Sequence, residues 1–173
     1  SPDNVWNVIK EFVLSDKKII GINLSRNFGQ HSALMAGYNK ASGDIIVTLD
    51  DDGQTPSDEV FKLIDKLNEG FDVVYGGYTQ RKDSTFRKFG TYVNNLMSEK
   101  LIGKPKNVHF TSYFAAKKFI IDEIVHYKNP YPYIWGLVTR TTKNITNVNV
   151  THRNRDIGAS SYTLKKLLGL WMN

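Results

Sequence analysis

The chain contains no cysteine, little proline and no long apolar run. The lack of cysteine among 173 residues excludes disulfide bonds, thiolate metal sites and cysteine nucleophiles, and it suits a reducing cytoplasm. Every apolar run falls short of the roughly 18 residues that a membrane-spanning helix needs. What is present is 40% hydrophobic residues with 9 Phe, 9 Tyr and 3 Trp, which excludes wholesale disorder and fits one domain with a sizeable core.

Charge is the second bulk feature. The chain has 23 Lys and Arg against 17 Asp and Glu, a net charge of +6 at neutral pH. This excess favours anionic partners such as nucleic acid, anionic lipid or phosphorylated ligands. Composition alone does not choose among them.

Short β-rich runs alternate with helical patterns along the chain. Residues 44–49 are almost continuously apolar, as in a strand covered on both faces. Strand–helix units at this spacing imply right-handed crossovers, so we expect an α/β fold with a mostly parallel sheet flanked by helices. The expected strands are 18–23, 44–49, 71–76, 110–116 and 145–152; the expected helices are 1–14, 30–41, 56–69, 86–101, 117–125 and 163–173, with an aromatic loop at 129–135.

The order of these elements is unusual. An α/β sheet normally begins with a strand, whereas this chain opens on a helix and closes within another. The opening helix carries an apolar stripe (Val5, Val8, Ile9, Phe12 and Val13) that predicts a core-facing position. We therefore expect residues 1–173 to form a single domain from the interior of a longer protein, with the first strand missing.

An acidic cluster, Asp50-Asp51-Asp52-Gly53-Gln54, follows the apolar strand. In parallel α/β sheets ligands bind outside the carboxyl ends of strands. A divalent cation would relieve the repulsion among the carboxylates, and Asp50, Asp52 and Gln54 would offer the oxygen ligands that Mg²⁺ or Mn²⁺ prefers. The alternative is a solvated turn that caps the next helix.

Basic residues follow two other expected strands. Arg81 and Arg87 come after residues 71–76, and Arg155 comes after the late strand, with Ser160 in a glycine-containing turn beyond it. Because Arg binds phosphate through two hydrogen bonds, a convergence of these residues would suit a lipid phosphate or a donor diphosphate. Solvated surface charge is the alternative.

Aromatic and histidine side chains give weaker signals. His31, at the start of the expected helix 30–41, could approach a donor, although packing is the commoner role. The loop bearing Tyr131, Tyr133 and Trp135 is a candidate for sugar stacking or membrane-interface contact, and packing against the core is the alternative.

Several stretches together carry a family resemblance. They are residues 24–33 (LSRNFGQHSA), Ala36-Gly37, Gly43-Asp44, the acidic cluster with Pro56, residues 80–88 and residues 155–162 (RDIGASSY). In this order they resemble family 2 glycosyltransferases, above all the polyprenyl-phosphate glycosyltransferases, such as dolichyl-phosphate mannose synthase and undecaprenyl-phosphate glucosyl or formamido-arabinose transferases. The resemblance covers nearly the whole chain.

The resemblance implies a GT-A fold, Rossmann-like, and inverting transfer of a sugar from a nucleotide donor. It implies that a divalent metal, Mg²⁺ or Mn²⁺, binds the donor diphosphate through Asp50, Asp52 and Gln54. With the residue arguments above, the expected site comprises Asp52 and Arg155 as catalytic residues, and Arg26, Asp50, Asp51, Arg81, Arg87 and Ser160 as ligand-binding residues.

Three departures from the family pattern bear on the reaction. The opening strand that binds the nucleotide base is absent, and Asp51 and Gly53 stand where Ala and Leu are common. Thr111-Ser112-Tyr113 aligns with a stretch in which several relatives carry an Asp. Serine is a poor base at neutral pH, but a phosphate acceptor is already ionised and needs no strong base, whereas an acceptor hydroxyl would.

The favoured function is metal-dependent transfer from a UDP- or GDP-sugar to a polyprenyl phosphate in cell-envelope biosynthesis. The alternatives are extension of a saccharide acceptor and a catalytically silent module that binds sugar nucleotides. We expect no nucleic-acid partner, because the acidic cluster would repel a phosphate backbone. A homo-oligomer is possible, and the full-length protein is expected in the cytoplasm, at the cytoplasmic face of the membrane, with residues 161–173 as an interfacial helix.

Overall fold

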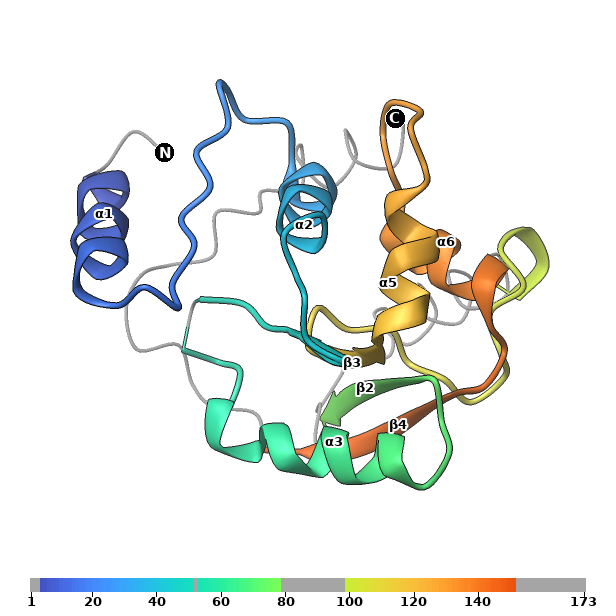
Figure 1. Ribbon diagram of the computed structural model, residues 1–173. Coiled ribbons are helices and arrows are strands. Elements are labelled where there is room, and N and C mark those ends of the chain that lie inside the picture. The colour runs from blue at the N-terminus through green and yellow to red at the C-terminus, as the bar shows by residue number, and fades with distance from the viewer. Residues whose placement is uncertain (1–3, 52, 79–98, 152–173) are drawn as a thin grey trace, which may run out of the picture.

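The computed structural model describes residues 4–51, 53–78 and 99–151 (Figure 1). Helices and strands alternate between residues 30 and 78, as the sequence predicts. In chain order the elements are α1 (Val5–Ser15), α2 (Gln30–Tyr38), β1 (Ile45–Thr48), the 3₁₀ helix η1 (Ser57–Glu59), α3 (Val60–Asn68), β2 (Val73–Tyr78), β3 (Phe114–Lys117), α5 (Lys118–Val125), α6 (Ile134–Thr141) and β4 (Ile145–Val150).

The described strands form one four-stranded sheet in the order β1-β3-β2-β4. Strand β3 is antiparallel to both of its neighbours, and β2 is parallel to β4. Three of the four strands, β1, β2 and β4, therefore point in one direction and end at the same edge of the sheet. The α/β class is confirmed and three of the four strands share one direction, but β3, reversed between β1 and β2, makes two of the three strand pairs antiparallel.

Helices cover both faces of the sheet (Figure 1). Alternate residues of β2 point to opposite faces, as the strand period requires: Val73 and Tyr75 join one buried cluster and Val74 joins the other. The first cluster includes side chains of α2, α5 and α6, and the second includes Leu63 and Leu67 of α3. The sheet thus lies between two helical layers, with α2, α5 and α6 packed on one face and α3 on the other.

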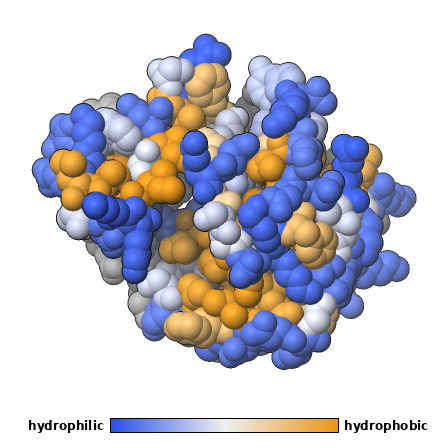
Figure 2. Space-filling model, viewed as in Figure 1, coloured by the Kyte–Doolittle hydropathy of each residue, from blue (hydrophilic) through white to orange (hydrophobic). Residues whose placement is uncertain are grey.

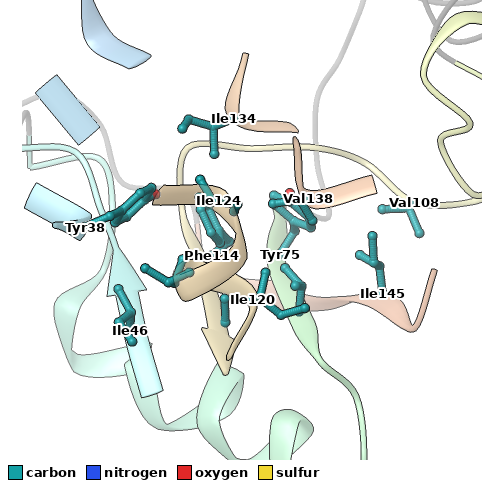
Figure 3. Close-up of a cluster of buried hydrophobic side chains, with 13 residues drawn as sticks. Tyr38, Ile46, Tyr75, Val108, Phe114, Ile120, Ile124, Ile134, Val138 and Ile145 are labelled. Atoms are coloured by element: carbon teal, nitrogen blue, oxygen red, sulfur yellow. The ribbon is translucent and has the colours of Figure 1, made fainter. Parts of the chain in front are cut away.

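The larger cluster forms the main core (Figure 3). Ile120 and Ile124 of α5 are fully or almost fully buried and lie close to Phe114 of β3 and Tyr75 of β2. The rings of Tyr75 and Phe114 are 5.1 Å apart between centroids. Burial of these aromatic and β-branched side chains is the main force that fixes the layers.

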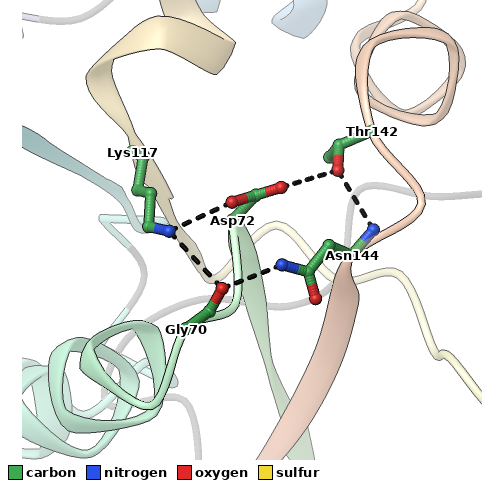
Figure 4. A network of polar contacts seen from close by, with 5 residues as sticks. All are labelled: Gly70, Asp72, Lys117, Thr142 and Asn144. Carbon is green, nitrogen blue, oxygen red and sulfur yellow. Dashed lines mark hydrogen bonds and ion pairs between the residues drawn. The ribbon is translucent and has the colours of Figure 1, made fainter.

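A polar network closes the edge of the sheet where β2 and β4 begin (Figure 4). Asp72 accepts hydrogen bonds from the Thr142 hydroxyl at 2.8 Å and from Lys117 Nζ at 3.1 Å, and Asn144 Nδ2 donates to the Gly70 carbonyl at 2.8 Å. The network ties the α3–β2 turn to the end of β3 and to the start of β4. It lies at the opposite edge from the strand ends where ligands were expected.

Two predictions near the N-terminus are wrong. Residues 18–23 do not form a strand, because no described strand pairs with them, and unpaired backbone groups give an isolated strand no stability. Helix α1 is present, but its stripe is not core-facing: Val5, Val8 and Phe12 are 44–57% exposed. Figure 1 shows α1 to one side of the sheet, and in Figure 2 apolar surface gathers on this side of the molecule.

The predicted loop 129–135 also differs, because α6 begins at Ile134 and Trp135 lies in its first turn. The expected helix 86–101 falls mostly outside the described residues, and the segment 161–173 falls outside them entirely. The single domain, the missing first strand and the longer parent protein remain predictions. Within the described ranges, no helix combines the length and apolar character needed to cross a bilayer.

Candidate active site

The acidic cluster begins two residues beyond the end of β1, at the edge where β1, β2 and β4 all end. The register pairs Thr48 of β1 with Phe114 of β3. Continuing this register two residues further brings Asp50 opposite Ser112, and the Ser112 hydroxyl donates a hydrogen bond to Asp50 Oδ2. The pairing of two antiparallel strands thus brings together residues that are 62 positions apart in the sequence.

A second contact to Asp50 comes from the start of α2. Gln30 is the first residue of this helix, and its Nε2 donates to Asp50 Oδ1 at 3.3 Å. The turn before the helix is closed by Asn27 Oδ1, which accepts from the Gly29 N–H at 2.8 Å. Gly29 has a φ of 85°, which favours glycine, so the local sequence Asn-Phe-Gly-Gln directs the helix start toward Asp50.

The rest of the acidic loop is anchored to Tyr113, the residue that precedes β3. The Tyr113 hydroxyl donates to the Pro56 carbonyl at 2.9 Å, and Thr55 is buried. Gly53 has a φ of 74°, a conformation that accounts for glycine where the family commonly has Leu. Asp51 is exposed and Gln54 is half-buried, whereas Asp52 lies outside the described residues.

Three aromatic rings pack beside these contacts. His31 lies edge-to-face with Tyr133 and with Trp135, at centroid distances of 5.5 Å and 5.2 Å, and Tyr133 and Trp135 lie edge-to-face at 5.6 Å. Trp135 Nε1 donates to the Thr111 carbonyl at 3.3 Å. Burial lowers the pKa of His31, so its imidazole is neutral at pH 7. His31 and Trp135 thus pack within this cluster, whereas Tyr133 is 43% and Tyr131 is 92% exposed, so a role of the loop in sugar stacking or membrane contact stays a prediction.

The remaining predicted residues divide between described and undescribed parts of the chain. Arg26 is exposed, with its guanidinium 4.7 Å from the centroid of the Phe28 ring. The other four, Arg81, Arg87, Arg155 and Ser160, lie outside the described residues. The strands that precede them, β2 and β4, end at the same edge as β1.

One contact at this edge was not expected from the sequence. Glu59 of η1 accepts a hydrogen bond from the Thr151 N–H at 3.0 Å and pairs with Lys62 at 2.8 Å. The bonds from Lys62 and Thr151 lower the pKa of Glu59 to about 2. They hold the end of β4 beside the helix that follows the acidic loop. A glutamate at a helix start is too common a feature to single out from sequence.

The side-chain oxygens of the acidic loop are of the type that a hard divalent cation binds. Asp50 and Gln54 supply only oxygen acceptors, and each Asp50 oxygen keeps lone-pair capacity beyond its one bond from Ser112 or Gln30. In the described ranges no three His, Cys, Asp or Glu side chains gather closely enough to hold a metal ion. A complete coordination shell would need Asp52 or groups of a bound ligand.

Comparison with known proteins identifies the family. Residues 1–125 match the family model described as glycosyl transferase family 2. The chain belongs to glycosyl transferase family 2. This confirms the resemblance in the motifs, including those that carry Gln30, Asp50 and Pro56.

Individual members of the family show which kind of transferase the chain is similar to. This glycosyltransferase is 37% identical over 155 residues to the undecaprenyl-phosphate 4-deoxy-4-formamido-L-arabinose transferase of Yersinia pestis strain Pestoides F, a match that covers 90% of this chain and 47% of that protein. The protein of the same name from Yersinia enterocolitica serotype O:8 has the same identity and coverage. The chain therefore spans about half the length of the curated relatives that it matches.

A solved structure supports the fold. Glucosyl-3-phosphoglycerate synthase of Mycobacterium tuberculosis, in complex with Mn²⁺, UDP-glucose and phosphoglyceric acid, superposes with a TM-score of 0.57 at 22% identity. The superposition covers 86% of this chain and 51% of that one. The expected GT-A fold is thus confirmed for this member of the family.

Proposed function

We propose that this glycosyltransferase catalyses metal-dependent, inverting transfer of a sugar from a nucleotide-sugar donor to a polyprenyl phosphate. The observation that carries the proposal is the pairing of Asp50 with Ser112 at the carboxyl end of β1. At position 112, where several relatives are expected to carry an Asp, this chain has a serine hydroxyl, which is a poor base. An acceptor that is already ionised, such as a lipid phosphate, does not need a base there. The names of the Yersinia relatives agree with such an acceptor.

In the proposed step an oxygen of the lipid phosphate attacks C1 of the sugar from the side opposite the nucleotide. The bond between C1 and the diphosphate oxygen breaks, its electron pair stays on the nucleoside diphosphate, and the configuration at C1 inverts. No proton has to move, because the acceptor oxygen carries its charge before the attack. The protein's task is then to place two anionic reactants in line.

The residues proposed for this task lie around the acidic loop and the strand ends. Asp50, Asp52 and Gln54 would hold Mg²⁺ or Mn²⁺, which when bound neutralises the charge of the departing diphosphate. The basic residues at the ends of the other two strands would bind phosphate oxygens. In this proposal Asp52 and Arg155 are catalytic, and Arg26, Asp51, Arg81, Arg87 and Ser160 contact the donor or the acceptor.

A lipid acceptor implies that the reaction takes place at a membrane surface. The cytoplasmic face, a contribution of residues 161–173 to membrane binding and a homo-oligomeric state remain predictions. The donor is proposed as a UDP- or GDP-sugar.

The test is a transfer assay. Membranes from cells that express the full-length protein are incubated with Mg²⁺ or Mn²⁺ and labelled UDP- or GDP-sugars, and lipid extracts are examined for label released by mild acid. We expect such label with the wild type and its loss with Asp50→Asn. Label in a saccharide instead would support the saccharide alternative, and donor binding without any transfer would support the silent module.

A further inference from the structure

Both carboxylate oxygens of Asp50 are engaged by neutral donors from distant parts of the chain. Gln30 Nε2 binds Oδ1 at 3.3 Å, and the Ser112 hydroxyl binds Oδ2. One donor comes from the start of α2 and the other from the segment that leads into β3. Together they restrict rotation of the carboxylate about its side-chain bonds, which a single donor would not do.

The two donors are themselves linked through the aromatic cluster. His31 follows Gln30 in α2 and contacts the Trp135 ring at 5.2 Å with an interplanar angle of 88°. Trp135 Nε1 in turn donates to the carbonyl of Thr111, the residue before Ser112. A closed chain of contacts therefore runs from Asp50 through α2, the cluster and the β3 approach back to Asp50.

The chemistry of the two donors suits a carboxylate that must stay able to bind a metal ion. Both are uncharged, so neither forms an ion pair that would compete for the charge of Asp50. An acidic side chain at position 112 would instead add a fourth negative charge beside three consecutive aspartates. Donors of this kind around a ligating carboxylate fix its orientation and commonly affect metal affinity.

We propose that Gln30 and Ser112 are positioning residues that hold the Asp50 carboxylate in one orientation, and that the contact between His31 and Trp135 keeps these two donors in place. The consequence for cation binding rests on the proposed function, in which Asp50 binds the metal. The orientation itself is a property of the protein before any ligand binds.

The experiment measures Mn²⁺ affinity of the purified protein in the presence of UDP or GDP, by calorimetry or by the electron paramagnetic resonance of free Mn²⁺. The variants are Ser112→Ala and Gln30→Met, which remove one donor each, and Ser112→Thr, which keeps the hydroxyl. We expect about tenfold weaker affinity for Ser112→Ala and Gln30→Met. Ser112→Thr should stay close to the wild type, a rescue that general loss of packing does not predict.

Two further variants complete the design. Trp135→Phe keeps an aromatic ring but removes the donor to Thr111, so it should weaken Mn²⁺ binding less than Ser112→Ala does. The matched control is Thr141→Val, which removes a partly buried hydroxyl bonded to the Leu137 carbonyl within α6. It should leave Mn²⁺ affinity unchanged. Thermal unfolding of every variant confirms that affinities are compared between folded proteins.

The outcomes separate this inference from the proposed function. If Asp50→Asn abolishes Mn²⁺ binding while Ser112→Ala and Gln30→Met both keep wild-type affinity, the positioning role is wrong and the metal site stands. If Asp50→Asn itself leaves Mn²⁺ affinity unchanged, the proposed metal site is wrong, and the inference goes with it. Should Ser112→Ala fail to fold, Gln30→Met and Ser112→Thr still decide the question.

Discussion

The Tyr113 hydroxyl donates a 2.9 Å hydrogen bond to the Pro56 carbonyl and so joins β3's approach to the loop that carries the acidic cluster. Tyr113 is fully buried, as is Tyr75, whose hydroxyl has no hydrogen-bond partner among the described residues. Two fully buried tyrosines, one in each hydrophobic cluster, therefore differ in whether the hydroxyl makes a hydrogen bond. Comparing Tyr→Phe variants at the two positions therefore measures how much that hydrogen bond contributes to stability.

We expect Tyr113→Phe to lower the free energy of unfolding by about 1 kcal/mol, because it leaves a buried carbonyl without its donor. Tyr75→Phe should leave stability unchanged or raise it by up to about 1 kcal/mol, because it removes a buried hydroxyl that is unpaired. Urea unfolding of both variants measures the difference. Equal destabilisation of the two would mean that the Pro56 bond contributes nothing.

Gly76 of β2 is required by the close approach of two neighbours. A Cβ at this position would lie 2.7 Å from Tyr113 Cδ1 and 3.1 Å from Val150 Cγ2, whereas at Gly77 the nearest atom would be 3.7 Å away. We expect Gly76→Ala to destabilise the protein by about 1–3 kcal/mol through overpacking. Gly77→Ala is the matched control and should be nearly neutral. Melting temperatures of the two variants test this, and similar losses for both would contradict it.

Much of the fold could be predicted from sequence because its signals are local. Residues 44–49 read as a strand covered on both faces, and the expected helix 56–69 is present as η1 and α3, with Leu67 buried against the sheet. The local pattern of residues 18–23 could not show whether a strand forms there. A strand needs a partner, and β propensity says nothing about whether one is present. The prolines at 130 and 132 likewise concealed that α6 starts at Ile134.

The candidate site was predicted in part for the same reason. Asp50 stood out because three aspartates follow an apolar strand. Its pairing with Ser112 depends on the reversed direction of β3, which no local pattern encodes. The contact from Gln30 depends on the angle at which α2 leaves its glycine turn. Tertiary packing sets both, and the motif stretch 24–33 was the available hint for Gln30.

The network around Asp72 should make stability depend on acid. Burial raises the pKa of Asp72, but the hydrogen bonds from Thr142 and Lys117 outweigh it, so the pKa lies below the ordinary 3.8. At pH 7 we expect Asp72→Asn to cost about 1 kcal/mol, a modest value because Lys117 is partly exposed to solvent. Asp65→Asn, the same change at an exposed position of α3, should be neutral.

The pH dependence gives the sign of this effect. A carboxyl with a lowered pKa in the folded state contributes stability that is present above pH 3.8 and is lost as pH falls through the folded value. The difference in unfolding free energy between wild type and Asp72→Asn should therefore shrink as pH falls below 3.8. A difference that stays constant from pH 7 to pH 3 would show that the charge of Asp72 does not stabilise the fold.

His31 gives a pH dependence of the same sign as Asp72, but near neutral pH. Burial lowers its pKa from the ordinary 6.5, since the imidazole is packed between Tyr133 and Trp135 and its Nδ1 is buried without a partner among the described residues. The unfolded chain then binds the proton more readily than the folded one. The stability tied to neutral His31 is complete above pH 6.5 and is lost as pH falls through the lower folded value.

The variant His31→Phe keeps an aromatic ring in the cluster but cannot take up a proton. Wild-type unfolding free energy should fall more between pH 7.5 and pH 5.5 than that of His31→Phe, and the excess is the contribution of this one group. His126→Phe, at an exposed position after α5, is the control and should follow the wild type.

Because His31 lies next to Gln30, partial opening of the cluster at low pH should also weaken the hold on Asp50. Mn²⁺ affinity of His31→Phe should then vary less with pH than that of the wild type. Identical pH profiles for the two proteins would show that the aromatic cluster has no influence on cation binding at Asp50.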